Sequence, residues 1–243
     1  KQVIAVSGTH GKTSVSAMTS KIFLDQHPET GYLIAGETKD FPSSSRLGSG
    51  DFFVLEADEY DSAFFDKRSK FIHYRPKTLL INNLEFDHAD IFNDLSDIQQ
   101  QYSQLLRTLA SDACVIYPNS DLNIEALFKK DFFSKTRTFS FEQDVIKISQ
   151  LNNYGSKFEV FRSDESFGEV NWELIGEHNL SNALASLTIA DELDLNLLKA
   201  VKSLSSFKGV SRRMELLFSN DKIHIYDDFA HHPTAIKKTI EGL

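Results

Sequence analysis

The hydrophobic pattern alternates between apolar runs and amphipathic stretches along most of the chain. This alternation is typical of βαβ units, in which helices connect the strands of a parallel sheet. We expect sheet strands at residues 3–7, 52–56, 78–82, 113–117 and 136–141, and helices at residues 13–24, 95–109, 123–129, 179–191 and 195–204. The pattern therefore predicts an α/β fold with a mainly parallel sheet that is flanked by helices.

The pattern of hydrophobic and polar residues changes between residues 145 and 174. Three short alternating segments, at residues 145–148, 157–161 and 169–174, are separated by polar turns. Such segments predict a small antiparallel sheet that is appended to the α/β core.

A third region begins after residue 206. Residues 207–213 contain Gly209 and three basic side chains, which is typical of a linker, and residues 222–226 begin a new strand. We therefore expect one large domain at residues 1–206, a linker at 207–213 and the start of a second domain at 214–243. The chain opens directly on a strand, without an initiator Met, and ends inside a predicted helix, so we expect a fragment of a longer protein.

Composition narrows the class of protein. The 243 residues are 41% hydrophobic and 25% charged, as in an ordinary globular protein, and no apolar run approaches the roughly 18 residues of a membrane span. The net charge of −9 argues against non-specific binding to nucleic acid or an anionic membrane. The single cysteine, Cys114, excludes an internal disulfide and a cysteine-based zinc site, which fits a reducing cytoplasm.

The first predicted strand ends at a glycine-rich turn that is followed by a predicted helix. The turn reads Ser-Gly-Thr-His-Gly-Lys-Thr-Ser over residues 7–14. Glycines let backbone N–H groups approach phosphate oxygens, and the helix N-terminus adds positive partial charge. Lys12 can reach the β- and γ-phosphates and the Thr13 hydroxyl can ligate Mg²⁺. The spacing is tighter than in the general phosphate loop, because Val6 stands where that motif has a glycine. The turn predicts a site for ATP or GTP.

Acidic clusters follow two other predicted strands, at residues 56–61 and 85–90. Ligands of open α/β sheets bind at the carboxyl ends of the strands, so these carboxylates would face the bound phosphates. A Mg²⁺ ion between the two groups would relieve the repulsion. His88 lies in the second cluster, but imidazole is a poor ligand for Mg²⁺, so its residue type alone does not make it a metal ligand.

Six segments together resemble the Mur ligase family, whose members are ATP-dependent amide-bond ligases of peptidoglycan synthesis. They appear in the family's order and cover nearly the whole chain, at residues 7–13, 56–59, 83–88, 176–183, 212–215 and 227–233. The resemblance implies that residues 1–206 are the central ATP-binding domain and that residues 214–243 begin the Rossmann-like C-terminal domain. The family's N-terminal domain and most of its C-terminal domain would then lie outside this chain.

The resemblance also implies roles for individual residues. Lys12, Glu56 and His88 would be catalytic, with Thr13, Glu56 and His88 as the Mg²⁺ ligands. ATP would be held by Gly8, Thr9, His10, Gly11, Lys12, Thr13, Ser14, His178, Asn179, Asn182, Arg213, Asp228 and His231. Without the family, Asn179 could simply cap a helix, and Asp227 and Asp228 could cap the helix after Pro233. Some members carry a carbamylated lysine near the position of Ser103, where this chain has none.

Two branches of the family act on UDP-N-acetylmuramate. One adds L-alanine, and the other attaches the recycled tripeptide L-alanyl-γ-D-glutamyl-meso-diaminopimelate. Residues 59–76 resemble the tripeptide branch, so the expected substrates are UDP-N-acetylmuramate and that tripeptide, with ATP and Mg²⁺. The alternatives are the L-alanine branch and an inactive nucleotide-binding fragment. A switch GTPase is disfavoured because the chain lacks the motif Asn-Lys-x-Asp.

Overall fold

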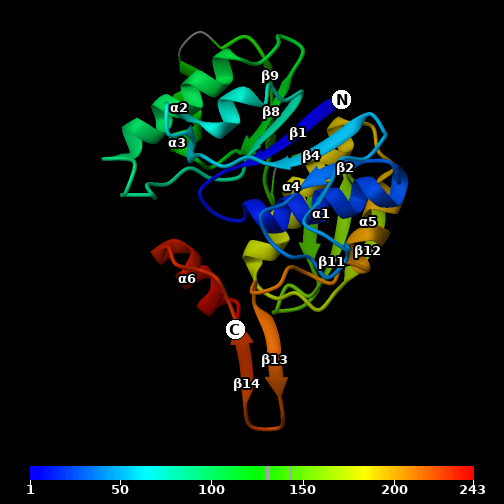
Figure 1. Cartoon of the computed structure of the whole chain (residues 1–243). Helices are drawn as coiled ribbons and strands as arrows, with labels where there is room; N and C mark the ends of the chain where they lie inside the picture. Colours follow the sequence, from blue (N-terminus) through cyan, green and yellow to red (C-terminus); the bar gives the residue numbers. More distant parts are fainter. Residues whose placement is uncertain (130–131, 143) are drawn as a thin grey trace.

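A seven-stranded sheet organises the protein, and the computed structural model describes residues 1–129, 132–142 and 144–243 of it (Figure 1). In spatial order the strands are β3 (Ser45–Arg46), β2 (Gly31–Leu33), β4 (Phe52–Glu56), β1 (Gln2–Ser7), β7 (Thr78–Ile81), β8 (Cys114–Pro118) and β9 (Lys135–Phe139). Each pair is parallel except β2 and β3, which are antiparallel. The predicted α/β fold with a mainly parallel sheet is confirmed.

Helices cover both faces of this sheet (Figure 1). Helices α1 (Lys12–Gln26), α4 (Glu177–Glu192) and α5 (Leu197–Ser205) bury one face, and α2 (Leu95–Arg107) and α3 (Leu122–Glu125) cover the other. Alternate residues of β1 enter the two cores: Ile4 and Val6 pack on the first face and Ala5 on the second. Burial on both sides explains why the central strands are continuous apolar runs.

The appended antiparallel sheet is also present. It consists of β10 (Ile146–Gln150), β11 (Lys157–Arg162) and β12 (Glu165–Asn171). Phe158, Val160 and Val170 join the same hydrophobic core as α4 and α5, so this sheet extends that core and is not a separate unit.

Some elements differ from the sequence expectations. The predicted helix 123–129 is divided into α3 and a 3₁₀ turn, η2 (Ala126–Lys129), and the strand expected at 169–174 lies at 165–171. Short pieces were missed, namely β2, β3 and the hairpin of β5 (Asp61–Ala63) and β6 (Asp66–Ser69), which precedes the 3₁₀ turn η1 (Lys70–His73). Strands of two to four residues are too short to show a period of two, and their pairing with neighbours defines them.

The C-terminal segment forms an antiparallel ribbon and a helix beside the core (Figure 1). The ribbon pairs β13 (Glu215–Ser219), which was missed, with β14 (His224–Asp227), and α6 (Pro233–Glu241) follows. His232 caps α6, so neither Asp227 nor Asp228 does. Likewise Gly176 precedes α4, so Asn179 is not its N-cap. Within the described part of the chain, no helix combines the length and the apolar character that crossing a membrane requires.

Candidate nucleotide-binding site

The glycine-rich turn connects β1 to α1 at the carboxyl edge of the sheet. Gly8 and Gly11 have φ values of 131° and 78°, a region of backbone conformation that L side chains rarely adopt. A Cβ on Gly11 would lie 2.7 Å from Asn82 Nδ2 and 2.8 Å from Asn182 Oδ1. The turn therefore requires glycine at residue 11 for both conformation and space.

The segment that directly follows the neighbouring strand β7 holds this turn in place. The backbone N–H of His10 donates to Asn83 Oδ1 at 2.7 Å, and the side-chain amides of Asn82 and Asn83 donate to the His10 carbonyl at 3.1 and 3.0 Å. The Glu85 backbone N–H donates to the Thr9 hydroxyl at 2.9 Å. These bonds fix the loop conformation before any ligand arrives, as a phosphate cradle requires.

Lys12, Glu59 and His88 form a charged group beside the loop, in which Glu59 is buried and the other two are partly buried. Lys12 Nζ lies 3.0 and 2.9 Å from the two Glu59 carboxylate oxygens, and His88 Nε2 lies 2.9 Å from Glu59 Oε1. The hydrogen bond to Glu59 raises the pKa of His88, although burial acts against it. Burial acts to raise the pKa of Glu59, but the bonds from His88 and Lys12 outweigh it and the net shift is downward. The group favours an ionised carboxylate between two cations.

The backbone of His88 adds a second sign of a functional position. Its φ is 57°, in the left-handed region that non-glycine residues seldom occupy. Its N–H is bonded to Asp87 Oδ1 at 2.8 Å. Such conformations are concentrated at active sites and ligand clamps.

Thr13, at the start of α1, and Glu56, at the end of β4, form a second polar pair. The Thr13 hydroxyl donates to Glu56 Oε1 at 2.8 Å, and Glu56 Oε2 accepts the Ala35 backbone N–H at 2.7 Å. Burial raises the pKa of Glu56 despite these bonds. Arg213 Nη2 lies 3.4 Å from the Thr13 hydroxyl, so a residue of the C-terminal segment reaches the start of α1. The hydroxyl and carboxylate oxygens are of the type that Mg²⁺ prefers.

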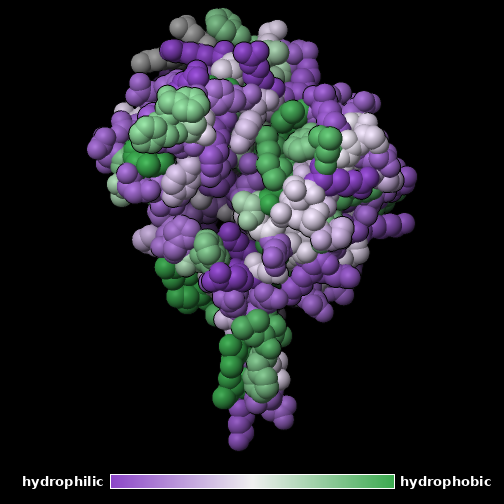
Figure 2. Space-filling model, viewed as in Figure 1, coloured by the Kyte–Doolittle hydropathy of each residue, from purple (hydrophilic) through white to green (hydrophobic). Residues whose placement is uncertain are grey.

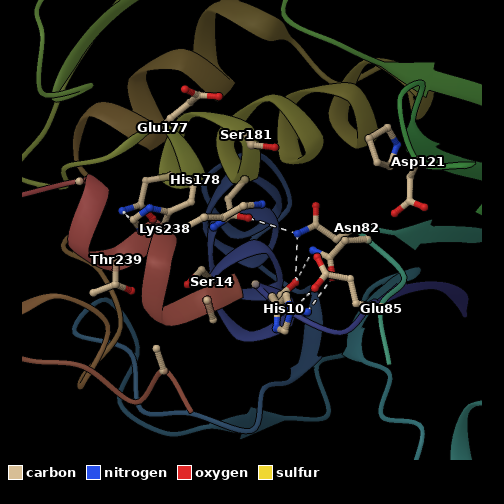
Figure 3. A pocket seen from close by; sticks show the side chains of 18 of the residues that line it. His10, Ser14, Asn82, Glu85, Asp121, Glu177, His178, Ser181, Lys238 and Thr239 are labelled. Atoms are coloured by element: carbon tan, nitrogen blue, oxygen red, sulfur yellow. Dashed lines mark hydrogen bonds and ion pairs between the residues drawn. The ribbon is translucent and has the colours of Figure 1, made fainter. Parts of the chain in front are cut away.

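A cavity of about 840 Å³ opens between the loop, the end of β7, the first turn of α4 and the C-terminal segment (Figure 3). Eight of the predicted site residues line it: His10, Gly11, Ser14, His178, Asn179, Asn182, Arg213 and Asp228. Its volume is in the range of small-molecule and cofactor sites.

Helix α4 contributes a polar wall to the cavity, and hydrogen bonds hold its asparagine side chains in place. Asn179 Nδ2 donates to the Ile175 carbonyl at 2.7 Å, and Asn182 Oδ1 accepts from Asn82 Nδ2 at 3.3 Å. His178 Nδ1 is buried without a hydrogen-bond partner, and burial lowers the pKa of this side chain. The side chains of His178, Asn179 and Asn182 contribute polar groups to the α4 wall of the cavity.

The residues expected around ATP do not all meet in this structure. Asp228 lines the cavity, where its two oxygens accept the backbone N–H groups of Met214 at 2.8 Å and Ala230 at 2.7 Å. His231, in contrast, is exposed, lies outside the lining, and places Nδ1 3.1 Å from the Phe229 carbonyl oxygen. The structure therefore brings Asp228 to the site and not His231.

Sequence reasoning did not select Glu59 or Glu85, although the site brings both into contact with predicted residues. Glu59 joins Lys12 to His88, and Glu85 lies beside His10, with 3.5 Å between Glu85 Oε2 and His10 Nε2. Both belong to the acidic clusters at the strand ends. Their position at a strand end pointed to the site, but the spacing of the acids did not show which of them would make the contact. Strand order was the missing information, because β4 and β7 flank β1 on its two sides.

The strand, glycine turn and helix, with lysine and hydroxyl side chains at the helix start, define an α/β domain with a phosphate-loop arrangement. Residues 6–190 match the model of the Mur ligase middle domain. This match covers more than half of the chain, and the chain belongs to the Mur ligase family.

Individual relatives agree with this family. The chain is 44% identical over 99% of its length to the UDP-N-acetylmuramate–L-alanyl-γ-D-glutamyl-meso-2,6-diaminoheptandioate ligase of Escherichia coli, covering 52% of that protein. It is 34% identical over its whole length to the UDP-N-acetylmuramate–L-alanine ligase of Desulfitobacterium hafniense, again covering 52%. A crystal structure of a murein peptide ligase from Psychrobacter arcticus superimposes with a TM-score of 0.79 at 37% identity, over all of this chain and 54% of that one. The chain thus spans about half the length of these relatives.

Proposed function

We propose that this chain is the ATP-binding part of a ligase that joins UDP-N-acetylmuramate to the tripeptide L-alanyl-γ-D-glutamyl-meso-diaminopimelate in peptidoglycan recycling. The observation that carries the proposal is the 44% identity over 99% of the chain to the tripeptide-adding relative, against 34% to the L-alanine-adding one. The substrates place the reaction in the cytoplasm, where ATP and nucleotide sugars are available.

The loop and its neighbours fit ATP and Mg²⁺. The side chain of Lys12, which begins one residue after the second glycine of the turn, is 13% exposed, and the oxygens of Thr13 and Glu56 lie 2.8 Å apart. Lys12 would exchange Glu59 for the phosphates when ATP enters, because both are anionic partners for the same ammonium group. We propose Thr13 and Glu56 as metal ligands, and His88 with Glu59 beside it as a second position for a divalent ion.

The proposed reaction activates a carboxylate. The lactoyl carboxylate of UDP-N-acetylmuramate attacks the γ-phosphate in line and gives an acyl phosphate and ADP, and the tripeptide amine then displaces phosphate. Bound Mg²⁺ would neutralise phosphate charge and so permit one anion to approach another. Lys12 would stabilise the charge that develops on the transferred group, and the fixed loop would hold the triphosphate in position. No residue of the chain has to become covalently bound.

The remaining predicted residues would hold the rest of the nucleotide. His178, Asn179 and Asn182 supply polar groups for the adenine, Arg213 reaches toward the phosphates, and Asp228 would accept ribose hydroxyls. Asp228 would have to exchange a backbone hydrogen bond for the ribose, which a movement of the C-terminal segment would allow. His231 is proposed to approach only after such a movement.

We also propose that residues 1–206 form the central ATP-binding domain, that residues 207–213 form a linker, and that residues 214–243 begin a C-terminal domain. The ribbon of β13 and β14 supports this division, because it extends from the core with apolar side chains on its surface (Figure 2). Those exposed side chains are Leu216, Leu217, Phe218, Ile223 and Ile225. This chain covers only about half the length of the relatives, so those proteins are long enough to contain further domains.

The test is ADP release by the full-length protein to which we assign this chain. It is measured with UDP-N-acetylmuramate and either the tripeptide or L-alanine as the amine. We expect release with the tripeptide and not with L-alanine, and loss of release in a Lys12→Ala variant. Release with L-alanine alone would transfer the assignment to the other branch, and nucleotide binding without release under either condition would reduce the proposal to a binding module.

A further inference from the structure

A second group of metal-ligating side chains, of which His10 and Glu85 line the cavity, is separate from Thr13, Glu56 and His88. It consists of His10 in the loop, Glu85 after β7 and His232 at the start of α6, and the three can present ligand atoms within 4.8 Å of one another. Figure 3 shows the side chains of His10 and Glu85 facing each other at the edge of the cavity. We propose that His10, Glu85 and His232 form a binding site for a divalent transition metal such as Zn²⁺, which fastens the C-terminal segment to the phosphate loop.

The distances are close to those of a zinc site. Glu85 Oε2 lies 3.5 Å from His10 Nε2 and 3.8 Å from His232 Nδ1. Zinc bonds of about 2.0–2.1 Å in a tetrahedral arrangement place the ligand atoms roughly 3.3 Å from each other. The two nitrogen–oxygen pairs therefore need to approach by only about 0.2–0.5 Å, and the three ligand atoms as a group lie within 4.8 Å of one another. The two imidazole rings already lie together, with 4.3 Å between their centroids.

The two histidines are oriented for this role. His232 Nε2 lies 3.0 Å from the Phe86 carbonyl oxygen, which can only accept, so Nε2 donates and Nδ1 keeps its lone pair. A metal-bound histidine commonly donates its second N–H to a backbone carbonyl in this way. Nδ1 also accepts the Thr234 N–H at 3.3 Å, a long bond that metal binding would replace. His10 Nε2 is buried and has no hydrogen-bond partner.

The third ligand is held in place by the same helix. The Thr234 hydroxyl donates to Glu85 Oε2 at 2.6 Å, so the oxygen that faces both histidines is also fixed to α6. The side chains of His10, Glu85 and His232 are 14%, 34% and 15% exposed, so a fourth position on the metal would be open to solvent or to a small ligand. An open position with three protein ligands is typical of zinc sites that are not purely structural.

The ligand types separate this site from the proposed magnesium site. Two imidazoles and one carboxylate are a set that suits Zn²⁺ and its neighbours in the transition series, whereas Mg²⁺ prefers oxygen atoms and water. The three ligands come from the loop, the sheet edge and the C-terminal helix, so a bound metal would restrain all three segments at once. It would hold the cavity in the arrangement that the structure shows.

The test is a calorimetric Zn²⁺ titration of the 243-residue chain with Mg²⁺ in large excess, with Co²⁺ absorption as an independent probe of nitrogen ligands. We expect one Zn²⁺ per chain. His10→Gln and His232→Gln should each weaken binding by at least about 10-fold. His224→Gln, at an exposed histidine on β14, should bind as the unaltered chain does. Circular dichroism without metal establishes that each variant is folded, and Glu85→Gln replaces either histidine variant that is not.

Two results would contradict the proposed zinc site. Unchanged Zn²⁺ affinity in the folded His10, His232 and Glu85 variants would show that these residues do not bind the metal. Loss of binding in His88→Gln, with His10→Gln unaffected, would place the zinc on the group of Glu59 and His88 instead. Because binding is measured without nucleotide or substrate, neither result depends on whether the chain supports ligation.

Discussion

His10 is a histidine that the fold keeps neutral. Its pKa is lowered to about 4, first by burial and then by the charge of His232, whereas Glu85 and Asp87 act in the opposite direction. The pKa of the unfolded chain is close to 6.5, so between these values the unfolded state binds a proton that the folded state does not. The stability associated with His10 is therefore complete above about pH 6.5 and decreases as the pH falls toward 4.

We predict that His10→Gln flattens the dependence of stability on pH. In metal-free buffer, the free energy of unfolding of the unaltered chain, measured in urea, should fall by on the order of 2 kcal/mol between pH 6.5 and 4 because of His10. The variant should not show this contribution to the fall. His178 contributes in the same direction, because burial lowers its pKa too, so the slope decreases without vanishing. The exposed His224→Gln serves as the control. Parallel curves for His10→Gln and the unaltered chain would contradict this account.

At the residue scale, the sequence was most informative where chemistry and local order coincide. Lys12 and Thr13 follow a glycine turn after a strand, and that order alone predicts that they contact phosphate and metal. Glu59 could not be selected in this way, because Glu56, Asp58 and Glu59 lie within four residues of one another at the end of one strand. Which carboxylate meets Lys12 depends on how the chain leaves β4, and that path is fixed by contacts from residues far away in the sequence.

At the scale of elements, the start of α1 depends on one glycine. Gly11 precedes the helix in a left-handed conformation, and its Cα faces the side-chain amides of Asn82 and Asn182. A left-handed alanine costs about 1–2 kcal/mol, and displacing the two amides adds the loss of about one hydrogen bond. Gly11→Ala should therefore reduce the free energy of unfolding by about 2–3 kcal/mol in urea titrations.

Gly155→Ala separates the two causes of that loss. Gly155 has a φ of 72°, close to the 78° of Gly11, but a Cβ there would come no nearer than 3.3 Å to the Leu180 side chain and the Gly176 carbonyl oxygen. We expect a smaller loss than for Gly11→Ala, because the conformational cost is similar and the crowding is less. If the two variants lose the same stability, crowding by Asn82 and Asn182 adds nothing to the loss at Gly11.

The hydrophobic pattern predicted two kinds of element well: strands that are buried on both faces, and helices that bury one broad apolar face. Strands β1, β4, β7 and β8 are apolar runs between two helical layers, so their positions follow from composition alone. Strand β13 was missed because its apolar side chains are exposed and no alternation marks an inner face. Strands β2 and β3 are defined by their pairing at the edge of the sheet. Such pairing leaves no periodic pattern in a single sequence.

At the scale of the whole molecule, the cavity is shared by two parts of the chain that are distant in sequence. The loop and α4 provide one wall, and Arg213, Asp228, Lys238 and Thr239 provide the other (Figure 3). Few buried contacts hold the second wall, since no residue of α6 is buried. Such a segment opens locally at low free-energy cost, and a ligand that touches both walls suppresses the opening.

We therefore predict that ADP with Mg²⁺ slows amide hydrogen exchange in two separate regions, the loop at residues 8–14 and helix α6. Ligand at 100 times its dissociation constant stabilises the bound form by about 2.7 kcal/mol, which corresponds to roughly 100-fold slower exchange wherever opening requires release of the nucleotide. The sheet of β10, β11 and β12 contributes no residue to the cavity lining and is the internal control. Protection of the loop without protection of α6 would mean that the nucleotide contacts only the first wall. Arg213 and Asp228 would then have to be removed from the proposed ATP site.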